Sequence, residues 1–362
     1  MFIFITVFVS IVYLVLITIF LIGWFRLSSF EPTSAEKINT KISLVIACRN
    51  EEQSLPKLLA NLAQQSYQEF ELLLINDHST DSTLEIMMGA KSYFKNIQII
   101  DALGFGKKNA LNEGVSKADE KFIITTDADC TPSFHWLESI VSFQLEHRCD
   151  LVICPVKIKE STSFYDKLQV LEFSTLVASG AAASAAGMPI LCNGASLAFT
   201  KKAWQDSWGE LHVEEQSGDD IFLLQSIKKR GGKIRFLKSR SAFVFTNPAK
   251  TLPDFFAQRH RWAGKSTKYT DWQLIATAIV VFGVNLYMFC LLCLAIFAPH
   301  HWLQLLFVFV LKYFLDTIFL YNIRYFFQLD FVWFYALILS LIYPFYIVFV
   351  GISALVFKPK KW

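Results

Sequence analysis

At residues 121–130 the chain reads Lys-Phe-Ile-Ile-Thr-Thr-Asp-Ala-Asp-Cys. The apolar run from Phe122 to Thr126 predicts a strand that is covered on both faces, as in a parallel sheet. Asp127 and Asp129 follow it, and residues two apart in an extended segment point the same way. Two close carboxylates repel each other unless a cation lies between them, and oxygen ligands suit Mg²⁺ or Mn²⁺. The stretch therefore predicts a divalent metal that holds a diphosphate at a strand end. A solvated Asp-rich turn is the alternative.

The composition indicates a membrane protein. Of 362 residues 54% are hydrophobic and 35 are Phe, and the mean hydropathy is +0.39. These values are too apolar for an ordinary soluble protein. A net charge of +3 gives no case for a nucleic-acid partner. The seven cysteines show no zinc-type spacing in the polar part of the chain, which fits a reducing compartment.

Four apolar segments are long enough to cross a bilayer: residues 2–24, 274–298, 302–321 and 331–357. A signal peptide is a poor alternative for the first, because no basic residue precedes it and the run is too long. Basic residues follow it, so the positive-inside rule places the polar region in the cytoplasm. We therefore expect a multi-pass cell-membrane protein with an N-terminal transmembrane helix (1–26), a cytoplasmic domain (41–268) and about three C-terminal helices (272–357). Three final crossings would place the C-terminal lysines outside, so the topology of these helices stays open.

Two charged residues within the third apolar segment, Lys312 and Asp316, are four positions apart. Residues at this spacing meet on one face of a helix. Charged groups at membrane depth usually face protein or water. We expect the two side chains to pair and the helix to pack inward on that face.

The polar region alternates strand and helix patterns. Expected strands are 42–47, 70–75, 97–100 and 122–126, and expected helices are 54–65, 82–90 and 108–115. This order predicts a mostly parallel, doubly wound α/β sheet, in which ligands bind outside the carboxyl ends of the strands. Residues 164–187 predict a helix, either at the membrane surface or under the site, or buried in the domain. Residues 253–262 predict a helix whose Arg and Trp residues suit the headgroup boundary.

The order of motifs resembles the family 2 glycosyltransferases, with their GT-A nucleotide-sugar fold, across about residues 42–265. Residues 43–52 (Ser-Leu-Val-Ile-Ala-Cys-Arg-Asn-Glu-Glu) are similar to that family's first strand and nucleotide loop. Residues 73–81 resemble its second strand with the base-binding aspartate, and residues 106–112 its G-K-x-x-A-L-N helix start. Asp127-Ala-Asp129 matches its D-x-D, and Gly218-Asp-Asp220 falls where the catalytic base lies. Residues 258–262 match the Q-x-x-R-W motif of membrane-embedded synthases and of lipid glycosyltransferases resembling ceramide glucosyltransferase.

The resemblance implies a role for each matching residue. Residues expected to bind the nucleotide sugar are Ala47, Arg49, Glu51, Asp77, Lys107 and Asp127. Asp129, assisted by Asp127, would bind Mg²⁺ or Mn²⁺. Asp220 would be the catalytic base and Asp219 its neighbour. Residues expected near the acceptor and the diphosphate are Asn193, Gly194, Gln258, Arg261 and Trp262.

Each role has a structural alternative. Lys107 could be a solvated surface lysine, and Arg49 could form an ordinary surface ion pair. Asp77 suits an Asx turn or helix cap. Asp219 suits the N-cap of a helix over residues 221–229. Residues 191–196 suit a structural turn.

We expect an inverting glycosyltransferase. A carboxylate within hydrogen-bond reach can take the proton of the attacking hydroxyl, and the resemblance implies direct displacement with one base. The donor would be a nucleotide sugar, with UDP the usual nucleotide in the resembled family. The acceptor would be a membrane-associated lipid or glycan, and a lipid is favoured because four nearly all-apolar spans offer little polar path for a polymer. The alternatives are a processive polysaccharide synthase and a non-catalytic, nucleotide-binding membrane protein.

Overall fold

The computed structural model describes residues 2–32, 40–159, 163–215, 217–330 and 332–356. They form two compact units. The sheet unit comprises Leu27–Lys159 and Pro189–Asn247, and the helical unit comprises Met1–Arg26, Glu160–Met188 and Pro248–Trp362. Residues 163–188 and 248–268, which the sequence placed in the globular domain, thus belong to the helical unit. The C-terminal lysines, on which the topology of the last helices depends, lie outside the described residues.

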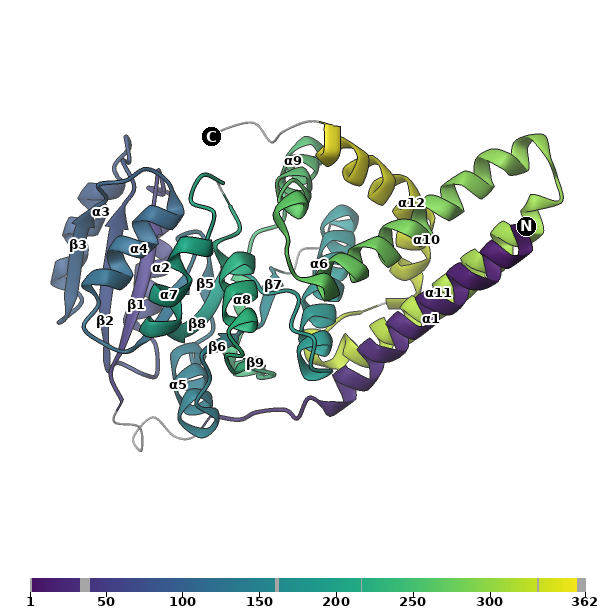
Figure 1. Cartoon of the computed structure of the whole chain (residues 1–362). Helices are drawn as coiled ribbons and strands as arrows, with labels where there is room; N and C mark the ends of the chain where they lie inside the picture. Colours follow the sequence, from purple (N-terminus) through teal and green to yellow (C-terminus); the bar gives the residue numbers. More distant parts are fainter. Residues whose placement is uncertain (1, 33–39, 160–162, 216, 331, 357–362) are drawn as a thin grey trace. The chain divides into compact units, whose positions relative to one another are not determined.

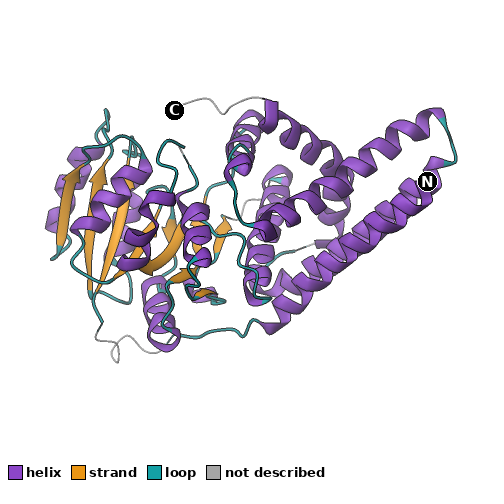
Figure 2. Ribbon diagram, viewed as in Figure 1, coloured by secondary structure: helices purple, strands orange, loops and turns teal. Residues whose placement is uncertain are grey.

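The sheet unit is built on a seven-stranded sheet with the order β3-β2-β1-β4-β8-β6-β9. Its strands are drawn in orange in Figure 2. Its strands are β1 (Ile42–Cys48), β2 (Phe70–Asn76), β3 (Ile97–Asp101), β4 (Phe122–Thr126), β6 (Leu151–Ile153), β8 (Ser196–Thr200) and β9 (Ile234–Phe236). The first four pair in parallel, which confirms the expected mostly parallel sheet. β8 runs antiparallel to both β4 and β6, a feature that the sequence did not predict. A smaller sheet has the order β5-β10-β7, with β5 (Thr131–Pro132), β7 (Val156–Ile158) and β10 (Val244–Thr246).

Helices connect and cover these strands (Figure 1). They are α2 (Leu55–Ala63), α3 (Thr83–Gly89), α4 (Lys107–Lys117), α5 (Trp136–His147), α7 (Lys201–Ser207) and α8 (Asp219–Lys229). Short 3₁₀ turns lie at Ala90–Ser92, Trp208–Glu210 and Arg240–Ala242. Gly114 lets α4 lie directly on the sheet, since a Cβ there would meet Val45 Cγ1 at 2.5 Å and Ile75 Cδ1 at 2.6 Å. This packing holds the first residue of α4, Lys107, near the carboxyl ends of the strands.

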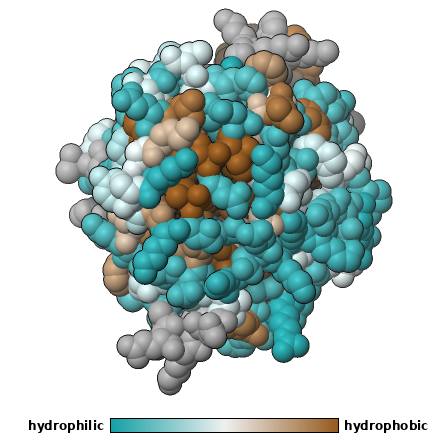
Figure 3. Space-filling model, turned by 90° about the vertical axis from the view of Figure 1, so that its left-hand side faces the viewer, coloured by the Kyte–Doolittle hydropathy of each residue, from teal (hydrophilic) through white to brown (hydrophobic). Residues whose placement is uncertain are grey.

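The core of the sheet unit is the pair of strands β1 and β2. Every residue of β2 and all but Ala47 of β1 are buried, as expected for strands covered on both faces. β3 forms one edge, and Ile97, Gln98 and Ile99 there are half-exposed. The view from the side of that edge shows apolar side chains gathered at its centre and surrounded by hydrophilic ones (Figure 3).

The helical unit contains four helices that are long and apolar enough to cross a membrane, counted among the described residues. They are α1 (Phe2–Arg26), α10 (Trp272–Phe297), α11 (His301–Phe327) and α12 (Val332–Val356). Two further helices are α6 (Phe164–Ala185) and α9 (Leu252–Ala263), followed by a 3₁₀ turn at Ser266–Lys268. α6 packs closely against α1, because a Cβ on Gly23 would lie only 1.9 Å from the Ala182 carbonyl oxygen. Small residues at such crossings let helices approach each other closely. The helix predicted over residues 164–187, whose location the sequence did not decide, is therefore part of the helical unit.

The predicted charge pair on α11 is present. Lys312 Nζ lies 2.5 Å from Asp316 Oδ2, and Lys312 is buried. The Tyr13 hydroxyl of α1 donates to Asp316 Oδ1. Lys312 and Asp316 therefore contact protein groups, as expected for charges in an apolar helix.

Candidate active site

The site forms where the strand order reverses. The chain leaves β1 toward β2 and β3 and returns to β4 on the other side of β1. In open α/β sheets, ligands bind outside the carboxyl ends of the strands at such a reversal. Arg49 follows β1 and Asp127 follows β4, so the two expected binding segments meet at this point.

Lys107 lies between two acidic groups. Its Nζ donates to Asp127 Oδ1 at 2.5 Å and lies 3.6 Å from Asp219 Oδ2. Burial alone would lower the pKa of Lys107, but the charges of Asp127 and Asp219 outweigh it and raise that pKa. Lys107 thus stays protonated and joins the D-x-D segment to the aspartates at the start of α8. A solvated surface lysine, the alternative expectation, does not describe this position.

The two aspartates of α8 meet a glycine loop. The Gly194 N–H donates to Asp220 Oδ2 at 3.0 Å. A Cβ on Gly194 would lie 3.2 Å from Asp219 Oδ2 and 3.4 Å from Lys107 Nζ. Asn193 Oδ1 accepts from the Ala195 N–H at 3.0 Å, so the loop is also the structural turn given as its alternative. The acidic pair, Lys107 and the loop therefore form one cluster.

The alternative role of Asp219 as an N-cap is not observed. α8 begins at Asp219 itself, and the N-cap position is Gly218, with φ of +94°. Only glycine adopts this backbone conformation readily. The helix therefore starts two residues earlier than expected, and both aspartates lie in its first turn, where the helix dipole favours negative charge.

A group that could hold a metal ion lies beside Lys107. The ligand atoms of Asp127, Asp129 and Cys130 all lie within 4.8 Å of one another. Asp129 is exposed at the surface. The pKa of its carboxyl group is nevertheless raised, mainly because neighbouring atoms remove part of its hydration and secondly because of the charge of Asp127. Burial and the charge of Asp129 raise the pKa of Glu51 to about 7. The cluster therefore holds carboxylates whose charges disfavour one another, which is the environment that a divalent cation stabilises.

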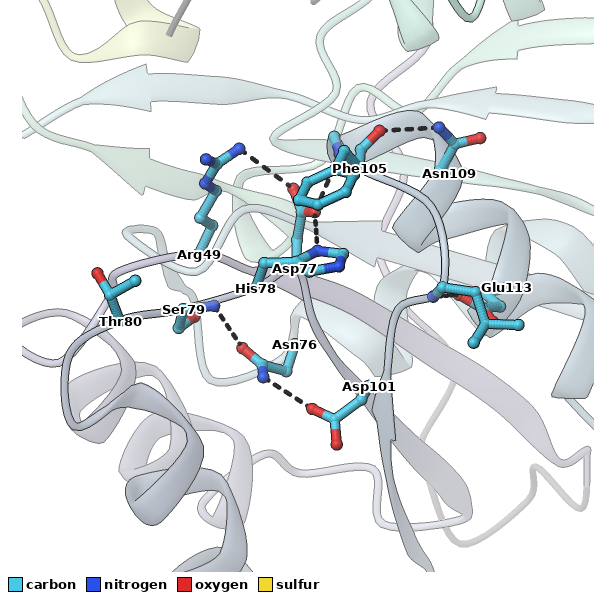
Figure 4. Close-up of polar contacts among 12 residues, drawn as sticks. Arg49, Asn76, Asp77, His78, Ser79, Thr80, Asp101, Phe105, Asn109 and Glu113 are labelled. Carbon is cyan, nitrogen blue, oxygen red and sulfur yellow. Dashed lines mark hydrogen bonds and ion pairs between the residues drawn. The ribbon is translucent and has the colours of Figure 1, made fainter.

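Two of the expected nucleotide-binding residues, Arg49 and Asp77, lie close together at the end of β2 (Figure 4). Asp77 Oδ1 accepts from the Gly106 N–H at 2.9 Å and lies 3.2 Å from His78 Nδ1. Arg49 NH1 lies 4.0 Å from Asp77 Oδ2. Asp77 forms neither the Asx turn nor the helix cap given as its alternatives. The local N–H groups of Ser79 and Thr83 donate to Asn76 and Asp81 instead. The Oδ2 atom of Asp77 faces the arginine.

A stacking contact between two rings beside Asp77 was missed from the sequence. The rings of His78 and Phe105 stack at 3.9 Å with an interplanar angle of 16°. Phe105 is 70% exposed, and His78 has φ of +58°, which non-glycine residues adopt rarely. An aromatic residue directly before the glycine of the G-K motif was the available signal, but its partner is distant in sequence. Ala47, also expected here, lies half-buried in β1 beside Ile75.

The Q-x-x-R-W residues lie in the other unit. Gln258, Arg261 and Trp262 are on α9, and Trp262 packs near Phe173 of α6 with ring centroids 6.2 Å apart. The structure therefore groups these three with the apolar helices rather than with the sheet. Their closure over a diphosphate stays a prediction.

The comparisons with known proteins agree with this architecture. Residues 43–202 match the model of the family described as Glycosyl transferase family 2. These residues are a family 2 glycosyltransferase domain. The poly-beta-1,6-N-acetyl-D-glucosamine synthase of Staphylococcus aureus (strain COL) is 26% identical over 229 residues, which are 61% of this chain and 53% of that protein. The synthase of the same name from Staphylococcus epidermidis is 27% identical over 231 residues. The chain thus spans about half the length of these relatives.

A solved structure resembles nearly the whole chain. It is the mannosyltransferase PcManGT from Pyrobaculum calidifontis, determined in complex with GDP-Man and Mn²⁺. It is 14% identical, has a TM-score of 0.56, and covers 96% of this chain and 98% of its own. This likeness concerns the fold, and it confirms that the glycosyltransferase domain has the expected GT-A architecture.

Proposed function

We propose that the protein is a metal-dependent, inverting glycosyltransferase that moves a sugar from a nucleotide sugar to a membrane-associated acceptor. The observation that carries this proposal is the position of Lys107, which contacts Asp127 on one side and Asp219 on the other. One cluster therefore offers a cation site, a fixed positive charge and the carboxylate of Asp220. In sugar transfer from a nucleotide-diphosphate sugar, the cation and the positive charge stabilise the departing diphosphate, and the carboxylate takes the proton of the acceptor hydroxyl.

The donor would bind across the carboxyl ends of β1, β2 and β4. Asp77 Oδ1 already accepts from Gly106 and contacts His78, whereas Oδ2, which lies 4.0 Å from Arg49 NH1, keeps capacity to accept from an N–H of the base. The exposed Phe105 ring offers a stacking surface next to it, and bases stack on aromatic side chains. Lys107 and the N-terminus of α4 suit the diphosphate.

Asp127 and Asp129 would hold Mg²⁺ or Mn²⁺. Two adjacent carboxylates fit these ions, which bind proteins through one or two carboxylates together with substrate phosphates. When bound, the ion supplies Lewis-acid stabilisation of the departing diphosphate. Lys107 adds a second positive charge to the same leaving group.

Asp220 would take the proton of the acceptor hydroxyl. Asp219 is engaged by Lys107 at 3.6 Å, whereas Asp220 Oδ2 is held by the Gly194 N–H at 3.0 Å. That hydrogen bond orients Asp220 and leaves the carboxylate with further acceptor capacity. Direct attack with one base inverts the anomeric carbon.

A lipid acceptor fits the helical unit best. Four of its helices are long and apolar enough to cross a membrane. Two charge pairs of the unit, Lys312 with Asp316 and Arg259 with Glu172, are paired with each other within the protein. We propose that the helices anchor the protein in the cell membrane as a multi-pass protein, with the sheet unit in the cytoplasm.

A processive polysaccharide synthase is the second candidate. It is favoured by the two staphylococcal relatives, whose names describe synthases of a poly-N-acetylglucosamine. The match covers 61% of this chain. The two candidates share the same chemistry and differ in the acceptor and in the number of sugars added.

A donor screen with product analysis tests these proposals. Purified protein in detergent would be given Mn²⁺ or Mg²⁺, an extract of total membrane lipids and a panel of nucleotide sugars that includes UDP-N-acetylglucosamine and GDP-mannose. Release of free nucleotide and lipids carrying one or a few sugars are expected. A long polymer would establish the second candidate instead. Nucleotide binding without turnover of any donor would show a non-catalytic protein. Asp220→Asn should slow nucleotide release in this assay, whereas its matched control Asp206→Asn, at an exposed ion pair on α7, should not.

A further inference from the structure

The helix α9 carries a buried charge. Arg259 is 4% exposed and pairs with Glu172 of α6, which is 8% exposed. Removing two charges from water costs several kcal/mol per ion, and well-packed apolar residues in their place are often as stable or more stable. Stability alone therefore gives little reason for an ion pair at this position.

The Arg259 guanidinium contacts several groups at once. NH2 donates to Glu172 Oε2, and NH1 donates to Gln258 Oε1 at 2.7 Å. The Cζ atom lies 4.3 Å from the centroid of the Trp262 ring and 4.6 Å from that of Phe255. Two residues of the Q-x-x-R-W motif thus contact the same buried cation.

Glu172 is itself fixed by a second helix. The Tyr346 hydroxyl of α12 donates to Glu172 Oε1 at 3.4 Å. The rings of Phe255 and Phe256 on α9 also pack against Tyr346, with centroids 5.6 and 6.2 Å apart. The Glu172 carboxylate is therefore held in position between α6 and α12. Because Arg259 of α9 donates to it, the carboxylate in turn fixes the position of the Arg259 guanidinium.

We infer that Arg259, held by Glu172, is a positioning residue that sets the side chains of Gln258 and Trp262 for the acceptor. The inference rests on the proposed function and on the expectation from the sequence that these two motif residues act near the acceptor and the diphosphate. An arginine suits this role because its planar fork donates in two directions while its faces stack on aromatic rings. A lysine retains the charge, but it has neither the fork nor the flat faces.

Paired substitutions separate positioning from stability. Glu172→Met and Arg259→Met each leave one buried charge unpaired, whereas the double variant Glu172→Met/Arg259→Met removes both. The matched control is Lys312→Met/Asp316→Met, which removes another ion pair of the helical unit, with a buried lysine and a half-buried aspartate. Each variant is assayed for thermal unfolding, for UDP release from UDP-N-acetylglucosamine in water, and for sugar transfer to total membrane lipids. Another donor from the panel replaces this one if the wild type prefers it.

The double variant gives the deciding result. We expect it to unfold near the wild-type temperature and to release UDP in water within about twofold of wild type, but to transfer sugar to lipid at least about tenfold more slowly. Arg259→Lys should also lose transfer while it retains hydrolysis. The control pair should keep both reactions.

Three outcomes would overturn the inference, and a fourth would overturn the proposed function. Transfer restored to within about twofold in the double variant would show that the ion pair is structural only. Normal transfer in Arg259→Lys would show the same if the methionine variants fail to fold. Normal transfer by Gln258→Ala and Trp262→Ala would show that the motif has no acceptor role. Normal transfer by Asp220→Asn would show instead that the proposed catalytic function itself is wrong.

Discussion

Replacing Lys107 with methionine removes the positive charge that lies between Asp127 and Asp219. The side chain keeps its length but loses the contacts at 2.5 Å and 3.6 Å. We expect slow transfer, because the departing diphosphate loses a fixed positive charge. We also expect the metal-free protein to unfold more easily, because the carboxylates are left to repel each other.

The geometry sets the size of both effects. Hydrogen bonds to charged groups contribute about 1.5–3 kcal/mol when shielded, but about a third of the Lys107 and Asp127 side chains is exposed, at 34% and 36%. Solvent screening therefore reduces the expected loss of unfolding free energy to about 1 kcal/mol. For catalysis, loss of one donor to a developing charge costs about 2.7–4 kcal/mol, so kcat should fall about 10²- to 10³-fold.

The assay is the initial rate of nucleotide release at saturating donor, with thermal unfolding measured with and without Mn²⁺. Lys117→Met, at the exposed far end of the same helix, is the matched control and should behave like wild type. A fall of less than about threefold in kcat would refute the role given to Lys107. Equal unfolding temperatures of wild type and Lys107→Met without metal would refute the electrostatic account of the cluster.

Three further predictions concern neighbouring groups. Asp220→Asn should lower kcat by about 10²- to 10⁴-fold with little change in nucleotide affinity, and an unchanged kcat would exclude this base. Burial and the charge of Asp129 raise the pKa of Glu51 from 4.5 to about 7, so its ionisation disfavours the folded state as pH rises through that window. Glu51→Gln should therefore raise the unfolding temperature of the metal-free protein at pH 8 but not at pH 4, and equal shifts at both pH values would contradict this. Phe105→Ala should weaken UDP binding about tenfold in a calorimetric titration, whereas Tyr93→Ala, at another exposed aromatic residue, should not. Equal affinities would remove Phe105 from the base site.

The parallel half of the sheet follows directly from the sequence. The runs that form β1, β2 and β4 are apolar without alternation, and each is followed by polar residues, so both the strands and their functional ends are predictable. The antiparallel β8 was not predicted, because a five-residue strand shows its direction only through its partners. The sequence also did not predict the unit to which α6 belongs, because its contact with α1 joins segments more than 150 residues apart.

The site divides in the same way. Motif order predicted that Lys107, Asp127 and the aspartates of α8 belong to one site, because each has a chemical reason to lie near a diphosphate. The stack of His78 on Phe105 and the pairing of Arg259 with Glu172 depend on side-chain contacts between distant segments. A single sequence contains no local signal for such contacts.

The central claim is that Asp127 and Asp129 hold a divalent cation together with the donor diphosphate. Electron paramagnetic resonance of Mn²⁺ titrated into the purified protein, with and without UDP, tests it most directly. The account predicts one bound Mn²⁺ per chain, tighter binding when UDP is present, and loss of that binding in Asp127→Asn/Asp129→Asn. Mn²⁺ binding of wild-type strength in the double variant, with UDP present, would contradict it.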